Sequence, residues 1–113
     1  MSLKLTSEML RAAYNYLDFC PPFDHWNLPD GEEITFLVTR THDYGGFKSE
    51  GPARHIAVSQ KRNITTLTVL MTMAHEMIHV YQHTHGLEIK DDKTFGLLAD
   101  KVCKLHGFDR GIF

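Results

Sequence analysis

The stretch that decides the fold is residues 65–84, TTLTVLMTMAHEMIHVYQHT. Its apolar residues recur at spacings of three and four, which predicts one long helix with an apolar stripe. This stripe consists of Leu67, Leu70, Met71, Ala74, Met77, Ile78 and Tyr81. Asn63 or Thr65 can cap the start of the helix, and Gly86 can end it in the left-handed conformation. Because no other periodic segment is as long, we expect this to be the central helix of the fold.

Two further helices and about three strands are predicted around it. Residues 5–18 form an amphipathic helix that Thr6 or Ser7 can cap, and a last helix runs from about Asp92 to His106, with Gly107 as its stop signal. Alternation of apolar and polar residues predicts strands from Glu33 to Arg40 and from Arg54 to Ser59, with a short third strand around Phe47. This order predicts an α+β domain in which helices cover a small antiparallel sheet.

The composition fits one domain, residues 1–113, with 42% hydrophobic and 23% charged residues. Twelve Lys and Arg against 14 Asp and Glu give a net charge of −2 without any run of like charges, so the charge does not support binding to DNA. The apolar stretches are too short to cross a membrane, and a secretory signal is lacking. We therefore expect a cytoplasmic protein without a membrane partner, in which Cys20 and Cys103 are reduced, buried thiols.

A metal-binding motif lies within the central helix, His75-Glu76-Met77-Ile78-His79, which has the pattern HExxH. Histidines four residues apart project from the same face of a helix, so both can reach one zinc ion at roughly 2.0–2.1 Å. Glu76 flanks this pair and can accept the proton of a metal-bound water that attacks a carbonyl. The motif predicts a zinc-dependent peptidase with His75 and His79 as ligands and Glu76 as the general base.

The spacing of the residues leaves the third zinc ligand open. His83 extends the same stripe, but it lies about 12 Å further along the helix than the first histidine of the motif, which is too far for one ion. His85 has the ligand spacing of the metzincin pattern HExxHxxGxxH, although Gln82 stands where that pattern has a helix-breaking glycine. The remaining candidates are Asp91 and Asp92, either of which could instead cap the last helix.

The HExxH helix, the connection to Gly86 and the Phe-centred segment 95–109 together resemble the SprT-like (Spartan-type) metallopeptidases, particularly their short phage and prophage members. The segments 38–40 and 54–56 are also similar, so the resemblance covers roughly residues 28–113. It implies a zincin-like fold with the HExxH motif on the central helix.

The resemblance also implies an identity for the third ligand. In the SprT-like family this ligand is a histidine four residues before the Phe of the last helix, and here that position is Asp91, which leaves Asp92 as the helix cap. A carboxylate is an accepted zinc ligand. Its negative charge, however, should make bound water less acidic and the zinc a weaker Lewis acid.

These observations predict an endopeptidase that hydrolyses peptide bonds of a protein or peptide substrate by Glu76-assisted attack of metal-bound water. The resemblance suggests DNA-associated proteins as substrates, although the chain lacks the cysteine pairs of the zinc ribbon found in longer relatives. The alternative is a catalytically weak or inactive zincin-fold protein that binds a protein partner. An intact Glu76 favours the enzyme, because a purely structural zinc site needs no base.

Two further expectations concern the substrate. The strand Arg54–Ser59 is expected near the site helix, where it could receive an extended peptide by strand addition. Tyr44, His55 and Tyr81 are candidates for stabilising the oxyanion, without a spacing argument for any of them. The oligomeric state and the cleavage preference are not contained in the sequence pattern.

Overall fold

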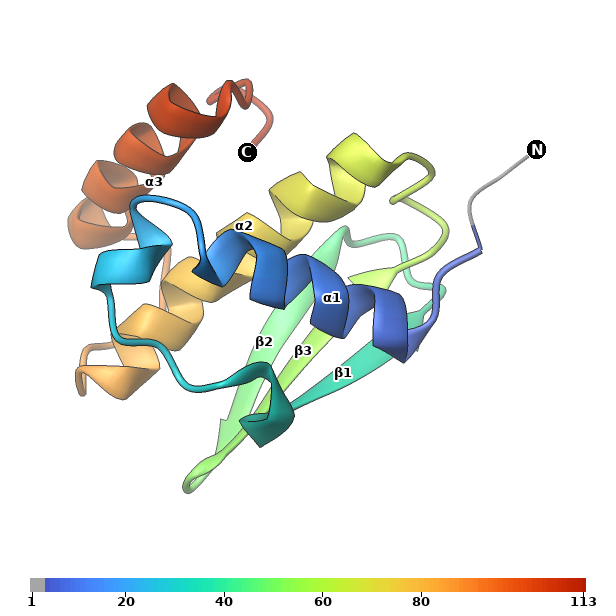
Figure 1. The fold of residues 1–113 in the computed structure, drawn as a ribbon, viewed down its shortest axis with the longest axis horizontal. Coiled ribbons are helices and arrows are strands. Elements are labelled where there is room, and N and C mark those ends of the chain that lie inside the picture. Colours follow the sequence, from blue (N-terminus) through green and yellow to red (C-terminus); the bar gives the residue numbers. More distant parts are fainter. Residues whose placement is uncertain (1–3) are drawn as a thin grey trace.

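The computed structural model describes residues 4–113, which form three α-helices and three strands (Figure 1). In chain order the elements are α1 (Ser7–Asp18), β1 (Ile34–Thr39), β2 (Gly45–Glu50), β3 (Ala53–Ser59), α2 (Thr66–Thr84) and α3 (Lys93–His106), with short 3-10 turns at Phe23–His25 and Gly31–Glu33. The predicted α+β class is therefore confirmed. All three predicted helices and all three predicted strands are present.

The sheet differs from the antiparallel sheet that the sequence pattern predicted. Its strand order is β1-β3-β2, in which β1 pairs with β3 in parallel and β2 pairs with β3 antiparallel. The chain reverses direction once after β1 and again at the turn through Gly51, whose φ is +58°. Two reversals leave β1 and β3 running in the same direction, so the sheet is mixed. The most buried strand, β3, occupies its centre.

This strand order also corrects the expected peptide-binding strand. Both edges of β3 are already paired, so Arg54–Ser59 cannot receive an extended peptide. The open edges of the sheet belong to β1 and β2 instead. Of these, β2 is the one that packs against α2.

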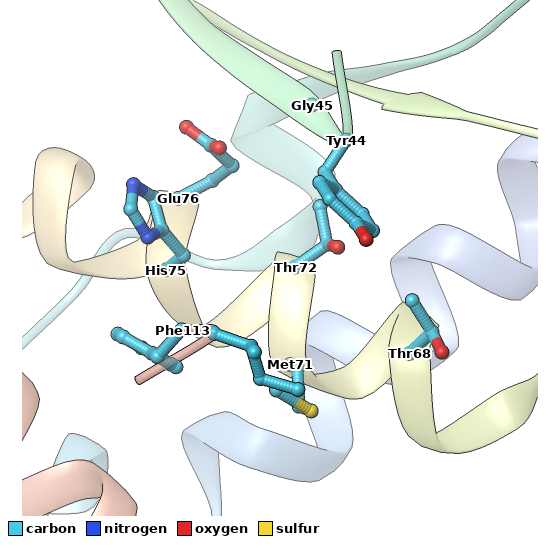
Figure 2. A pocket seen from close by; sticks show the side chains of 9 residues that line it. Tyr44, Gly45, Thr68, Met71, Thr72, His75, Glu76 and Phe113 are labelled. Atoms are coloured by element: carbon cyan, nitrogen blue, oxygen red, sulfur yellow. The ribbon is translucent and has the colours of Figure 1, made fainter. Parts of the chain in front are cut away.

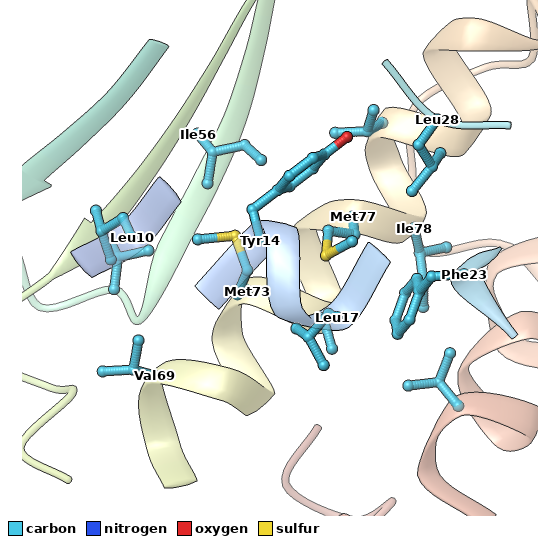
Figure 3. Close-up of a cluster of buried hydrophobic side chains, with 14 of the residues drawn as sticks. Leu10, Tyr14, Leu17, Phe23, Leu28, Ile56, Val69, Met73, Met77 and Ile78 are labelled. Atoms are coloured by element: carbon cyan, nitrogen blue, oxygen red, sulfur yellow. The ribbon is translucent and has the colours of Figure 1, made fainter. Parts of the chain in front are cut away.

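Helices α1 and α2 form a layer on one face of the sheet, and α3 packs against α2 (Figure 1). Helix α1 contacts β1, whereas α2 contacts β2 and β3 and lies between the sheet and α3. Figure 3 shows the core that results, in which Tyr14 and Leu17 of α1 meet Met73 and Met77 of α2 and Ile56 of β3. Most of the predicted apolar stripe is buried or partly buried, which fixes α2 at the centre of the fold, but the prediction is wrong for Leu67, which is 59% exposed near the start of the helix.

The helix ends decide between the predicted caps. Thr65 caps α2, because its hydroxyl accepts a hydrogen bond from the backbone N–H of Thr68 at 3.2 Å. Asn63 is instead fully buried, and its amide donates to the carbonyl oxygens of Tyr44 at 2.8 Å and Ser59 at 2.7 Å. Thr72 donates to the Asn63 side-chain oxygen at 2.6 Å. This network ties the segment before β2 to α2.

Two expectations from the composition concern the burial of the cysteines and membrane-spanning segments. Both cysteines are free thiols, but only Cys103 is buried, whereas Cys20 is partly exposed, so the prediction of two buried thiols is wrong for Cys20. Among residues 4–113, no helix has the length and apolar character needed to cross a membrane.

Candidate metal centre

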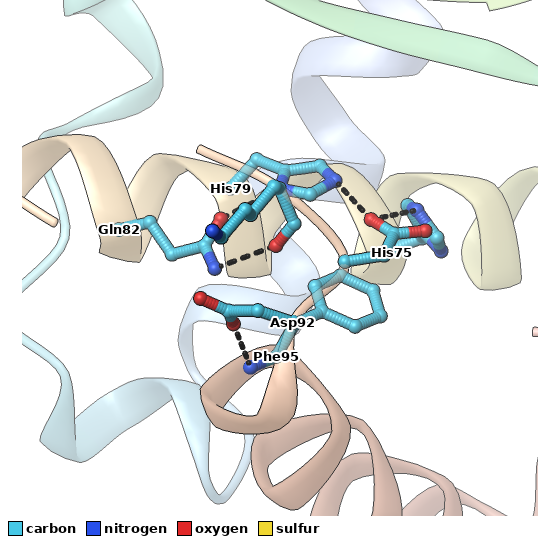
Figure 4. Close-up of polar contacts among 7 residues, drawn as sticks. His75, His79, Gln82, Asp92 and Phe95 are labelled. Carbon is cyan, nitrogen blue, oxygen red and sulfur yellow. Dashed lines mark hydrogen bonds and ion pairs between the residues drawn. The ribbon is translucent and has the colours of Figure 1, made fainter. Parts of the chain in front are cut away.

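The imidazoles of His75 and His79 lie side by side on α2 (Figure 4), and the carboxylate of Asp91, from the segment before α3, approaches both of them. Asp91 Oδ1 lies 3.2 Å from His79 Nε2 and 3.9 Å from His75 Nε2, and one ligand atom from each residue lies within 4.8 Å of the others. Bonds of roughly 2.0–2.1 Å in a tetrahedral zinc site separate neighbouring ligand atoms by about 3.3 Å. The three residues could therefore hold a metal ion of this kind after small side-chain movements.

Two neighbouring aspartates have different positions at the start of α3. Asp92 is the N-cap, because its Oδ1 accepts a hydrogen bond from the backbone N–H of Phe95 at 3.0 Å. Asp91 precedes the cap, and its side chain, 63% exposed, reaches the two histidines. Asp92 is therefore the helix cap, and Asp91 is the aspartate that lies beside the two histidines.

Gln82 is a site residue that the sequence pattern did not identify. It is fully buried, and its amide nitrogen donates to the Lys90 carbonyl at 2.9 Å, which turns its oxygen towards His79 (Figure 4). That oxygen lies 2.8 Å from His79 Nδ1, so the imidazole proton sits on Nδ1. The other ring nitrogen, Nε2, lies 3.2 Å from Asp91 Oδ1 and is the atom left for a metal. Gln82 both orients one ligand and anchors the loop that carries another.

This arrangement predicts a graded loss of zinc affinity when Gln82 is changed. Gln82→Leu should weaken zinc binding by about 10–100-fold, because the imidazole of His79 loses its orienting partner. Gln82→Glu keeps an acceptor for the Nδ1 proton and loses only the donor to Lys90, so it should weaken binding less. Competition with a chromophoric chelator measures both affinities. Equal affinity of Gln82→Leu and the wild-type protein would remove Gln82 from the site.

Aromatic rings enclose the two histidines. The Phe95 ring lies 4.7 Å from the His75 ring and 5.0 Å from the His79 ring between centroids, and the Phe113 ring lies 5.4 Å from His75. Burial, and after it the neighbouring His79, lowers the pKa of His75, although Asp91 and a hydrogen bond to the Phe113 backbone act in the opposite direction. A lowered pKa favours the neutral imidazole, which is the form that binds a metal.

Glu76 is buried beside the ligands, with only 5% of its surface exposed. Burial raises the pKa of its carboxyl to about 8, and the negative charge of Asp91 adds to this effect. In the metal-free protein the group therefore gains and loses its proton near neutral pH. A carboxyl with this property is suited to accept a proton and release it again.

The backbone of β2 comes close to Glu76 at Gly45. A Cβ atom at this position would lie 2.6 Å from the Ala57 carbonyl oxygen, 2.8 Å from Thr72 Cγ2 and 3.5 Å from Glu76 Oε2. A side chain at position 45 would push the strand away from β3 and α2. The neighbouring Gly46 has open space around the same point.

These two glycines provide a matched pair of variants. Gly45→Ala should lower the free energy of unfolding by about 1–3 kcal/mol, because backbone atoms have to move. Gly46→Ala should be neutral or stabilise by up to about 1 kcal/mol, since glycine is unfavourable inside a strand. Thermal unfolding of both variants measures the difference. Identical midpoints would show that the space at Gly45 is not required.

The other candidate residues lie apart from the ligand group. His85 is exposed, and its Nδ1 lies 2.9 Å from the Tyr81 carbonyl, while His83 accepts a hydrogen bond from Arg54 at 3.0 Å. The ring of Tyr81 packs against Trp26. The geometry therefore does not bring His85 to the position of a third ligand.

Of the three candidates for stabilising the oxyanion, Tyr44 borders the pocket that contains His75 and Glu76. Its hydroxyl accepts a hydrogen bond from Arg62 at 3.3 Å. His55 lines a different hollow, on the sheet, and Tyr81 is not part of the pocket wall.

Similarity to known proteins does not add to these observations. Comparisons of the chain with protein-family models, with curated proteins and with solved structures each find no match. The chemistry of the site itself is therefore what indicates a function.

Proposed function

We propose that this protein is a zinc-dependent endopeptidase of the SprT-like type. One observation carries the proposal: two imidazoles and a carboxylate lie within 4.8 Å of one another, next to the buried carboxyl of Glu76. Two histidines and one carboxylate are a known ligand set for catalytic zinc, which leaves a fourth position open for water or substrate.

In the proposed reaction, His75, His79 and Asp91 hold the zinc ion. The ion would supply a Lewis acid that polarises the substrate carbonyl and makes water more acidic. Glu76 accepts the proton of the attacking water and then delivers it to the nitrogen of the leaving amine. Gln82 keeps His79 in the tautomer that can bind the metal.

The open edge of β2 is the proposed place for the substrate backbone. An extended peptide can add to a free strand edge through main-chain hydrogen bonds. Strand β2 begins at Gly45, where its backbone approaches the Glu76 carboxylate. A peptide along this edge would therefore pass the general base.

A second candidate function is binding of a protein partner without hydrolysis. It is favoured by the carboxylate ligand, because the charge of Asp91 makes a bound zinc a weaker Lewis acid. The burial of Glu76 argues for the enzyme, since a structural metal site gains nothing from a desolvated carboxyl. The net charge of −2 gives DNA no electrostatic support as a partner.

The proposal is tested by zinc content and hydrolysis together. Protein that has not met a chelator should carry one zinc ion per chain by elemental analysis, with an affinity that falls in acid, because an imidazole has to be unprotonated to bind a metal. Phenanthroline should stop cleavage of an unfolded protein, and added zinc should restore it. A chain that takes up no zinc would refute the proposal. Zinc binding without cleavage, with or without single-stranded DNA, would favour the second candidate.

A further inference from the structure

A pocket of about 220 Å³ opens beside the metal-binding group (Figure 2). His75 and Glu76 form one end of the pocket. Tyr44, just before β2, and Gly45, the first residue of β2, form one of its sides. Met71 of α2 and the segment Ile112–Phe113 contribute apolar surface to its walls. The pocket therefore adjoins the place where the proposed function puts the bond to be cleaved.

The hydroxyl groups of this pocket already have partners within the protein. The Thr72 hydroxyl donates to Asn63 at 2.6 Å, and the Thr68 hydroxyl lies 2.9 Å from that of Thr65. The Tyr44 hydroxyl is bonded to Arg62. Apart from His75 and Glu76, no side chain of the wall is ionised at neutral pH, and Met71, Ile112 and Phe113 offer a ligand apolar contact.

The size of the pocket suits a large apolar side chain. A cavity of about 150 Å³ lined by apolar residues is sufficient to bind benzene. A substrate lysine or aspartate would lose its hydration here without a dedicated partner, which disfavours charged side chains.

We propose that this pocket receives a leucine- or phenylalanine-sized apolar side chain of the substrate, next to the bond that is cleaved. The inference rests on the proposed peptidase function, because that function supplies the substrate and the cleaved bond. The binding of an apolar group is a separate property that can be measured without hydrolysis.

The first measurement compares cleavage of peptides that differ at the residue on either side of the cleaved bond. Phenylalanine or leucine on one side should give a kcat/KM at least 10-fold above alanine, lysine and aspartate. Equal rates for all five residues, or a preference for a charged residue, would overturn the proposal while leaving the peptidase function intact.

The second measurement needs no catalysis. Titration of metal-free protein with N-acetyl-phenylalanine amide should shift the backbone amide NMR signals of Gly45, Thr68 and Met71. If peptides are not cleaved but these signals shift, the pocket assignment stands and the peptidase function fails. If the probe leaves these signals unchanged, the pocket assignment is wrong.

A matched pair of variants connects both measurements to the pocket. Thr68→Leu fills part of the pocket, so it should abolish the preference for phenylalanine over alanine and weaken probe binding. Thr66, in the same first turn of α2, is exposed and lies outside the pocket wall. Thr66→Leu should keep the wild-type preference. The same change of preference in both variants would contradict the assignment.

Discussion

Replacing Asp91 by alanine should reduce zinc affinity by well over 100-fold, more than the roughly 10–100-fold expected for a residue that only supports a ligand. The variant loses both a coordinate bond and a negative charge, and two histidines alone remain to hold the ion. Because the Asp91 side chain is 63% exposed, the metal-free variant should unfold at nearly the wild-type temperature. Zinc stoichiometry and thermal midpoint are the two measurements.

Three control variants separate the roles of the neighbouring residues. Asp92→Ala should cost about 0.5–2 kcal/mol of stability through loss of the cap, with zinc retained. Asp91→His should retain zinc and, without the carboxylate charge, make water at the site more acidic. His85→Ala should change neither quantity. Full zinc retention in Asp91→Ala together with zinc loss in His85→Ala would make His85 the third ligand.

Glu76→Gln should abolish hydrolysis of an unfolded protein and leave zinc binding intact. The amide has nearly the size of the carboxyl but cannot take a proton from water. Kinetics with purified wild-type and variant protein, each with its zinc content measured, test this result. Equal cleavage by the two proteins would assign the activity to a contaminant or to another mechanism.

The same variant should be more stable than the wild type in the metal-free form at high pH. The pKa of Glu76 is about 8 in the folded chain and ordinarily 4.5, so ionisation opposes folding and stability falls as the pH rises between these values. The glutamine cannot ionise. Its advantage in free energy of unfolding should be near zero at pH 4 and reach roughly 3–5 kcal/mol at pH 9. Denaturant titration at both pH values measures it, and a constant difference would contradict the buried, ionising carboxyl.

The helices were predictable because their signals are local. The apolar stripe of residues 65–84 specifies α2 and places His75 and His79 on one face. The cap of α3 was also predictable, because an aspartate three residues before Phe95 can accept a hydrogen bond from the backbone N–H of that residue. Each of these features depends on residues fewer than about five positions apart.

The arrangement of the sheet was harder to predict from the sequence, because strand order depends on the whole chain. Alternation in the segments of β1 and β3 predicts two strands but says nothing of whether they pair in parallel. The β2 segment begins with Gly45 and Gly46 and is nowhere fully buried, so its hydrophobic pattern is weak. Its place at the edge follows from the hairpin with β3 and from packing against α2.

Gln82 was missed for a related reason. Its role depends on the Lys90 carbonyl, which reaches it only after the chain has turned at Gly86. In the sequence it is one polar residue on a helix, three positions after His79. A completely buried amide needs hydrogen-bond partners, so the burial of Gln82 would have identified it as a residue with a specific role. Its burial, however, is known only once the fold is known.

The three candidate metal ligands come from two different kinds of structure. His75 and His79 belong to the helix at the centre of the core, whereas Asp91 follows an exposed loop. The apolar core formed by α1, α2 and the sheet includes neither Asp91 nor the loop before it. If the proposed function holds, sequence changes in this loop would tune how tightly the metal is held without cost to the stability of the core.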